Sequence, residues 1–104
     1  MLLSFHPLAW TGVCALQMKS LDIKHGELSS LNTAALGLSV DSVPSKKEWA
    51  DFLELEHTDI LADFWPHGDV AQKYDLFIDK LGFSGRANIL IDQKGAIEWF
   101  RIYE

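Results

Sequence analysis

The chain has 104 residues, of which 48% are hydrophobic and 23% are charged, and its formal net charge is −6. A chain of this length can bury one small α/β core but not two, so we expect residues 1–104 to form a single domain. The longest apolar runs are far shorter than the ~20 residues that a membrane span needs. Lysines and arginines are spread along an acidic chain, which excludes a basic stripe. The composition predicts a globular protein that binds neither membranes nor nucleic acid.

The first element is a short apolar run at residues 2–5, which Pro7 ends. The run lacks the positive charge and the cleavage site of a signal peptide, so a cytoplasmic location is expected by default. An apolar run of this kind is typical of a buried strand, which places the chain's first residue inside a sheet. From Thr11 to Leu31 apolar residues recur at helical spacing, which predicts an amphipathic helix that Gly26 weakens or breaks.

A second strand and a second helix are expected next. Residues 34–40 are apolar, and residues 41–44 form a loop after them. Ser45 and Glu48 have the spacing of a capping box, so the helix is expected to begin at Ser45. Its apolar face is expected to contain Trp49, Phe52 and Leu53.

The remaining chain repeats the pattern once and closes on a hairpin. Residues 59–64 are a third strand candidate, and a helix with an apolar face at Val70, Tyr74 and Phe77 is expected to begin near Asp69. Two final strands, 87–91 and 96–102, flank a turn whose Gly95 suits a positive φ.

Strands and helices therefore alternate in the order β-α-β-α-β-α-β-β. Right-handed crossovers in such a chain place helices on both faces of a mixed sheet. The sequence predicts the α/β class and a three-layer α/β/α sandwich. Aromatic residues at the periodicity of the elements are expected in its core: Trp49, Phe52, Tyr74, Phe77 and Trp99.

The loop between the first strand and the first helix is the place where open α/β sheets put their binding sites. If Thr11 is the N-cap, Cys14 lies three residues into the helix, where unpaired amides and the helix dipole favour a thiolate. Position alone leaves another interpretation open, because a lone cysteine in an apolar helix stripe is usually a small buried hydrophobe. The single cysteine excludes an intramolecular disulfide and any CxxC site.

The spacing of Pro7, Thr11 and Cys14 resembles the active-site motif of the peroxiredoxins, the AhpC/TSA family of the thioredoxin-like superfamily. The strand before this loop resembles the family's strand at that place, and residues 37–42 resemble its next strand and turn. Arg86, just before a predicted strand, resembles the arginine that the family brings beside the cysteine. The resemblance implies a thioredoxin-like fold with a central mixed sheet.

The resemblance also implies a thiol-specific peroxidase that reduces hydrogen peroxide and alkyl hydroperoxides. The Cys14 thiolate would attack one peroxide oxygen, leaving water or an alcohol and a cysteine sulfenic acid. Arg86 would stabilise the thiolate and the developing negative charge. Thr11 would hold the peroxide by a hydroxyl hydrogen bond, and Pro7 would shield the sulfur. No cofactor or metal is implied.

The implied cycle is of the one-cysteine type, because the chain contains no resolving cysteine. An external thiol would reduce the sulfenic acid, and thioredoxin, glutaredoxin and a low-molecular-weight thiol remain open as reductants. Thr11 stands where a thioredoxin-type dithiol site needs a cysteine, which excludes disulfide exchange by a CxxC motif.

The sequence departs from the family pattern at two positions near the cysteine and at both ends. Ala15 stands where a hydroxyl residue is common, and Gln17 stands where a glutamate often positions the arginine. Family members usually have further strands ahead of the first one here and more structure after the last hairpin. The chain is therefore expected to be either incomplete at both ends or a natural minimal form.

An uncovered strand edge invites pairing with another chain, so a homodimer is the expected partner arrangement. The alternative hypothesis is a catalytically inert, truncated thioredoxin-fold interaction module with a buried Cys14.

The other polar and aromatic residues receive structural assignments. No metal site is expected, because the histidines lie at no metal-ligand spacing: His6, His25, His57 and His67. His6 flanks the motif and is assigned either to the peroxide pocket or to packing. Strand ends and helix caps are expected at Asp59, Asp63 and Asp69. Trp10 is assigned to the wall of the site or to a subunit interface, and Trp65 to a turn.

Overall fold

The structure, a computed structural model, describes residues 1–103 and has a five-stranded mixed sheet at its centre. The strands lie in the order β3-β2-β1-β6-β7. β1 pairs in parallel with β2 and antiparallel with β6, so the start of the chain lies in the middle of the sheet, as predicted. The strands of this sheet are β1 (Leu2–Phe5), β2 (Ala35–Ser39), β3 (Asp59–Ala62), β6 (Arg86–Ile91) and β7 (Ile97–Tyr103).

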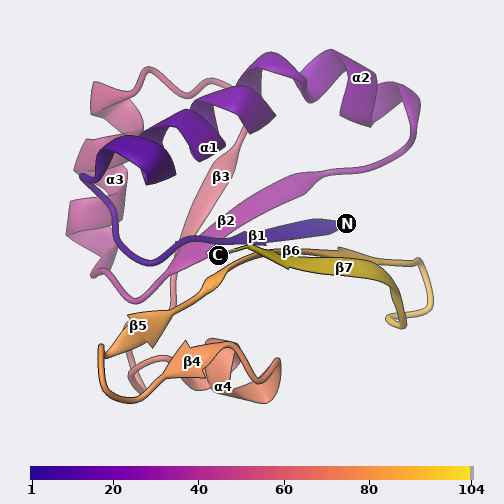
Figure 1. Cartoon of the computed structure of the whole chain (residues 1–104). Helices are drawn as coiled ribbons and strands as arrows, with labels where there is room; N and C mark the ends of the chain where they lie inside the picture. The colour runs from indigo at the N-terminus through magenta and orange to yellow at the C-terminus, as the bar shows by residue number, and fades with distance from the viewer. Residues whose placement is uncertain (104) are drawn as a thin grey trace.

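Helices cover both faces of the sheet (Figure 1). One face carries α1 (Gly12–Ile23), α2 (His25–Ser30) and α3 (Val43–Phe52). The chain moves from β1 to β2 to β3 in one direction, so two right-handed crossovers place these helices on the same side. The other face carries the short helix α4 (Asp69–Lys73) with a small sheet of β4 (Phe77–Ile78) and β5 (Phe83–Ser84). The predicted three-layer α/β/α sandwich is confirmed. Within residues 1–103, no helix is long and apolar enough to cross a membrane.

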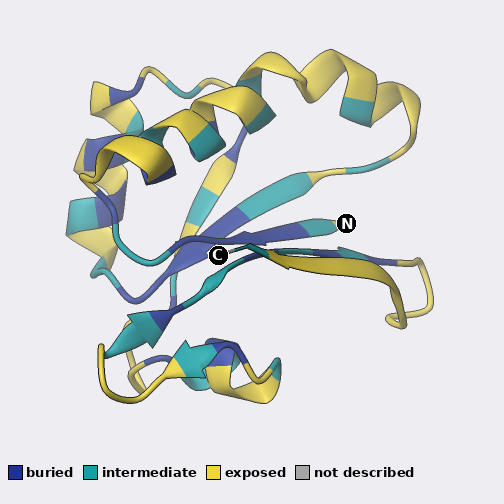
Figure 2. Ribbon diagram, viewed as in Figure 1, coloured by how far each residue is buried: buried dark blue, intermediate teal, exposed yellow. Residues whose placement is uncertain are grey.

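Each face of the sheet has its own apolar core. In Figure 2 the buried residues are the dark blue stretches of the ribbon, and they lie on the central strands and on parts of the helices. Against α4, the core consists of Leu3, Phe5, Leu38, Ala71, Leu76, Ala87, Ile89 and Ile91. Under α1 and α3 lies a smaller core of Ala9, Cys14, Met18, Trp49 and Leu53. Cys14 is therefore part of the packing between the two helices that flank the β1–α1 loop.

The first two helices differ from the sequence prediction at their ends. The long helix breaks at Lys24, two residues before Gly26, and Leu31 is exposed. The predicted capping box at Ser45 is wrong, because α3 begins earlier and Ser42 is its N-cap, accepting a hydrogen bond from the Ser45 amide. Pro44 in the first turn fits this earlier start, since a helix tolerates proline there.

Three of the aromatic assignments also change. Phe52 is 71% exposed and packs on the Trp10 ring rather than in the core. Trp99 is 48% exposed because β7 is an edge strand on which most residues face solvent. Phe77 belongs to β4 instead of a helix, since α4 ends at Lys73. Trp49 is buried as predicted, and Tyr74 packs against the core with Phe77.

Candidate active site

The β1–α1 loop delivers Cys14 to the first turn of a helix, as the sequence predicts. Thr11 is the N-cap with extended backbone angles, and Cys14 is the third residue of α1. The Thr11 hydroxyl donates to the carbonyl oxygen of Leu8 at 2.8 Å, which closes the loop on itself. Trp10 has a positive φ of 67° just before the helix. This sharp reversal turns the chain from the end of β1 into α1.

Arg86 reaches Cys14 because of the strand register. Phe5 pairs with Ala87 across the β1–β6 ladder, so Arg86 begins β6 beside the carboxyl end of β1. Its Nη1 lies 3.4 Å from Sγ of Cys14 and donates a hydrogen bond to it. A guanidinium keeps its charge throughout the physiological range, so it places a permanent positive charge beside the sulfur.

Gln17 holds Arg86 in this position. Its Oε1 accepts a hydrogen bond of 2.5 Å from Nη1 of Arg86. Its Nε2 donates to Oγ of Ser4 at 2.6 Å and to the carbonyl oxygen of Phe5 at 3.2 Å. The neutral amide therefore links the arginine to the buried strand β1.

Pro7 and Thr11 lie in the loop that precedes Cys14. Pro7 is half-buried and Thr11 is exposed at the start of α1. Cys14 itself is only 1% exposed. The structure thus brings Cys14 and Arg86 into contact, with Pro7 and Thr11 beside them in the chain, and covers the sulfur almost completely.

A buried polar network behind the loop was not predicted. Nζ of Lys46 lies 2.7 Å from Nε2 of His6 and donates to Oγ of Ser39 at 2.7 Å. The Ser39 hydroxyl in turn donates to Oδ2 of Asp41 at 2.5 Å, and the same oxygen accepts from the Ala9 amide at 2.8 Å. Lys46 is 2% exposed and His6 is fully buried. The sequence gives little indication of this network, because Lys46 lies in a segment whose polar residues are typical of the start of a helix.

Burial shifts the protonation of both basic groups in this network. Desolvation is the largest of the causes that together lower the pKa of His6 to about 3; the charges of Lys46 and Arg86 act in the same direction, while the backbone of Ser4 acts to raise it. Desolvation also lowers the pKa of Lys46 to about 7, against the opposing effect of negative charge on Asp41 and Cys14. His6 is therefore neutral at physiological pH, and Lys46 changes charge within that range.

Asp63 confirms the expectation of a helix-capping role. Its two carboxylate oxygens accept hydrogen bonds from the amides of Val70 and Ala71, in the first turn of α4. The aspartate thereby fixes the α4 segment to the end of β3 and takes no part in the Cys14 site.

Comparisons with known proteins agree with this geometry. Residues 1–100 match the family model described as "AhpC/TSA family". Alkyl hydroperoxide reductase E of Mycobacterium tuberculosis is 37% identical over 98 residues, which cover 94% of this chain and 63% of that protein. Peroxiredoxin 2 of Sulfurisphaera tokodaii is 34% identical, over 94% of this chain and 48% of its own length.

Solved structures show the same fold. The crystal structure of Enterococcus faecalis AhpC superposes with a TM-score of 0.91 at 24% identity, over 99% of this chain and 62% of that one. The reduced 2-Cys peroxiredoxin of Plasmodium vivax gives a TM-score of 0.86 at 28% identity, over 98% of this chain and 54% of its own. The chain thus spans less than two thirds of the length of these relatives, and its fold is the thioredoxin-like one that the motif implied. On the family match and these identities, the chain belongs to the AhpC/TSA family.

Proposed function

We propose that this chain reduces hydroperoxides through Cys14. The single observation that carries the proposal is the contact of 3.4 Å between Nη1 of Arg86 and Sγ of Cys14, in the first turn of a helix. A fixed cation and the free amides of the helix start both favour a thiolate, which is the nucleophilic form of the side chain. Family membership supports the same chemistry.

The reaction balances without a metal or cofactor. The Cys14 thiolate attacks one oxygen of ROOH, the O–O bond breaks, and the sulfur becomes a sulfenic acid. The departing RO⁻ takes a proton from solvent, equal to the one that the thiol released on ionising, and leaves as water or an alcohol. Arg86 stabilises the negative charge as it moves from sulfur to the leaving oxygen. Thr11 donates its hydroxyl to the bound peroxide in place of Leu8, and Pro7 keeps water from the sulfur.

An external thiol completes the cycle. One thiol condenses with the sulfenic acid to a mixed disulfide and releases water, and a second thiol reduces that disulfide. We propose a cycle of the one-cysteine type for these 104 residues, in which Cys14 is the single cysteine and another molecule supplies the thiol. Thioredoxin, glutaredoxin or a low-molecular-weight thiol supplies the electrons.

The edge strand β7 supports a homodimer as the assembled form. It exposes Ile97, Trp99, Phe100 and Ile102 together with its open backbone edge. An edge of this kind is a template for pairing with another chain. The single domain and the cytoplasmic location stay predictions.

The burial of Cys14 favours the alternative, an inert interaction module. Cys14 is 1% exposed and packs as a small apolar group in the same core as Met18 and Trp49, so a peroxide reaches its sulfur only if the loop opens. The contact with Arg86 weighs against this alternative, because apolar packing alone would not place a charged guanidinium against the sulfur.

Stopped-flow fluorescence during the reaction with hydrogen peroxide distinguishes the two functions. Trp10, four residues before the sulfur, is the reporter, and Cys14→Ser is the control. We expect a fluorescence change far faster than the oxidation of a free thiol, a sulfenic acid that dimedone traps, and neither signal in the control. Oxidation at the rate of a free thiol, with no dimedone adduct, would establish the inert module instead.

A further inference from the structure

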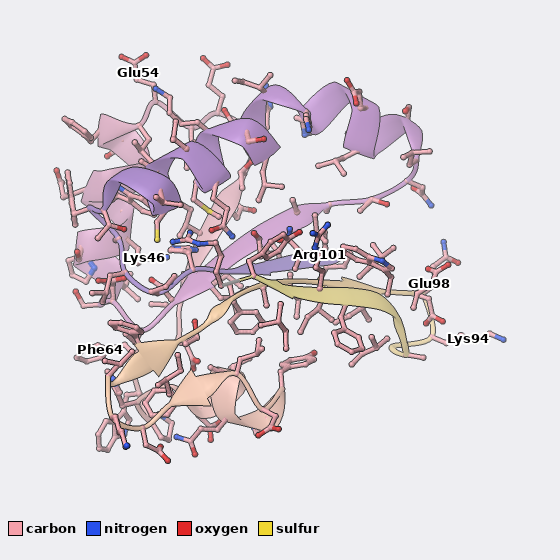
Figure 3. The ribbon with its side chains drawn as sticks, in the orientation of Figure 1. Lys46, Glu54, Phe64, Lys94, Glu98 and Arg101 are labelled. Atoms are coloured by element: carbon pink, nitrogen blue, oxygen red, sulfur yellow. The ribbon has the colours of Figure 1, made fainter. Side chains whose placement is uncertain are left out.

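The buried network around Lys46 holds the loop that carries Pro7 at two points. His6 directly precedes Pro7, and its ring contacts Nζ of Lys46. On the other side of Pro7, the Ala9 amide is bound by Asp41, which Ser39 connects to the same Nζ. In Figure 3 Lys46 lies inside the fold, whereas Lys94 extends into solvent from the β6–β7 hairpin. One buried amine is thus the common anchor of both ends of this short segment.

The direction of these hydrogen bonds follows from the charge on Lys46. An ammonium group has three donors and no acceptor, so Nε2 of His6 must accept and the ring proton must lie on Nδ1. Nδ1 has no hydrogen-bond partner among residues 1–103. The position of the ring proton is therefore dictated by the charge on Lys46.

Lys46 belongs to α3, which contributes no residue to the contact between Cys14 and Arg86. Its side chain is nevertheless buried, and its ammonium lies 5.5 Å from the centre of the Trp49 ring. The same ring lies 5.3 Å from the ring of His6. The Trp49 ring thus packs against both Lys46 and His6 and helps to hold the two side chains in place.

We propose that Lys46 is a positioning residue of the Cys14 site: its buried ammonium fixes the loop at His6 and Ala9, so that reactivity of Cys14 depends on the charge of Lys46. The proposal rests on the proposed peroxidase function and gives Lys46 a regulatory role at the same site. It involves no contact between Lys46 and the peroxide.

Two charged groups face Lys46, and they come from two different segments. Asp41 follows β2 and Cys14 lies on α1, and the negative charge of each acts to raise the pKa of Lys46. His6, from the loop after β1, stays neutral, and the charge of Arg86, at the start of β6, acts on His6. Charge-assisted hydrogen bonds are about twice as strong as neutral ones, so the loop is held most firmly while Lys46 is protonated. With a pKa of about 7, Lys46 loses that proton as the pH rises through neutrality. The neutral amine can accept from His6 as well as donate, which frees the ring to change tautomer.

The test compares Lys46→Met with Lys47→Met, a matched control at the next position of α3. Lys47 is exposed and makes only a surface ion pair with Asp51. The second-order rate constant for peroxide is measured for both variants and the unmodified chain from about pH 5 to 9. We expect Lys46→Met to react roughly tenfold more slowly at about pH 6, because small losses of positioning lower rates strongly. The ratio of unmodified to Lys46→Met rates should shrink above about pH 7, and Lys47→Met should match the unmodified chain.

A second readout does not require peroxide. In ¹⁵N-labelled protein, the His6 ring and the Ala9 amide should shift with a midpoint near the pKa of Lys46, about 7, although His6 itself does not titrate there. Ser39→Ala, which breaks the link from Lys46 to Asp41, should abolish the shift at Ala9 and keep the shift at His6. This variant also serves if Lys46→Met does not fold.

The outcomes separate the two proposals. Equal peroxide rates for Lys46→Met and Lys47→Met at every pH would overturn the role of Lys46, and so would His6 and Ala9 signals that stay constant around neutral pH. An unmodified chain that is inert toward peroxide, but shows the coupled shifts of His6 and Ala9, would overturn the peroxidase function and uphold the anchoring of the loop.

Discussion

The side-chain oxygen of Gln17 lies 2.5 Å from Nη1 of Arg86, the same nitrogen that donates to the sulfur of Cys14. The other end of the amide is bound to Ser4 and Phe5 of β1. A neutral residue thus orients the arginine by geometry alone. The charge on Arg86 then remains directed at the sulfur, because Gln17 offers it a dipole and no competing negative charge.

Replacement of Gln17 should slow the reaction with peroxide without unfolding the chain. Gln17→Leu removes the acceptor that fixes Arg86, and we expect the second-order rate constant to fall roughly tenfold. Gln17→Glu keeps an acceptor but adds a negative charge that disfavours the thiolate, so its rate should lie between those of the unmodified chain and Gln17→Leu. The measurement is stopped-flow fluorescence at neutral pH.

Lys19→Met is the control for this series, since Lys19 is exposed on the same helix. Its rate should equal that of the unmodified chain. If Gln17→Leu reacts as fast as this control, the orientation of Arg86 does not depend on Gln17.

A second prediction concerns Asp22, which fastens the loop after α3 to the end of α1. Its carboxylate accepts from the amides of Glu56, His57 and Thr58 at 3.1, 2.8 and 3.0 Å. Asp22→Ala leaves three backbone donors without this partner, and we expect a loss of about 1–2 kcal/mol in the free energy of unfolding, because the site is partly exposed to water. Urea denaturation at neutral pH measures this loss.

The effect of Asp22 should also depend on pH. Burial acts to raise the pKa of Asp22, but the hydrogen bonds from Glu56, His57 and Thr58 outweigh it and lower the pKa below 3.8. The folded state therefore binds this proton less readily than the unfolded chain, so the stabilisation is present above pH 3.8 and is lost as the pH falls through the folded pKa. Asp51→Ala, which breaks only an exposed ion pair, is the control and should change stability by less than about 0.5 kcal/mol. A peroxide rate that falls with Asp22→Ala at neutral pH would contradict a purely structural role.

The sequence was informative where one local rule dominates and uninformative where distant segments meet. Thr11 as N-cap placed Cys14 correctly, because capping depends on the immediate neighbours. Phe52 fits the apolar period of α3 but is exposed and packs on Trp10, and Trp99 lies on an edge strand, where period-two alternation does not guarantee burial. Periodicity alone does not reveal which face is covered.

The network around Lys46 illustrates the harder case. His6 and Lys46 are 40 positions apart, and they meet only because β1 and β2 are adjacent and α3 follows β2. A lysine near the start of a helix is usually solvated, so composition argues against its burial. Only the three-dimensional structure shows that the network of His6, Ser39 and Asp41 compensates for the cost of burying Lys46.

The third prediction is that His6 makes the fold sensitive to acid. Its pKa is lowered from 6.5 to about 3 in the folded state, chiefly by burial. Between these two values the unfolded chain binds a proton that the folded chain does not, so the free energy of unfolding falls as the pH decreases from 6.5 towards 3. The slope due to this one group approaches about 1.4 kcal/mol per pH unit. Urea denaturation at several pH values measures it.

His6→Gln separates the titration of His6 from its packing, because the glutamine oxygen can still accept from Lys46 but gains no proton in this range. The stability of the unmodified chain minus that of His6→Gln should therefore decrease as the pH falls below 6.5. His25→Gln, at an exposed histidine that stacks on His57, should follow the unmodified chain. The stabilisation by Asp22 changes with pH only below about 3.8, and Lys46 titrates near pH 7, so neither group produces a slope between 3.8 and 6.5. A constant difference across that interval would mean that His6 is accessible to protons in the folded state, and that the ring is not enclosed between Lys46 and Trp49.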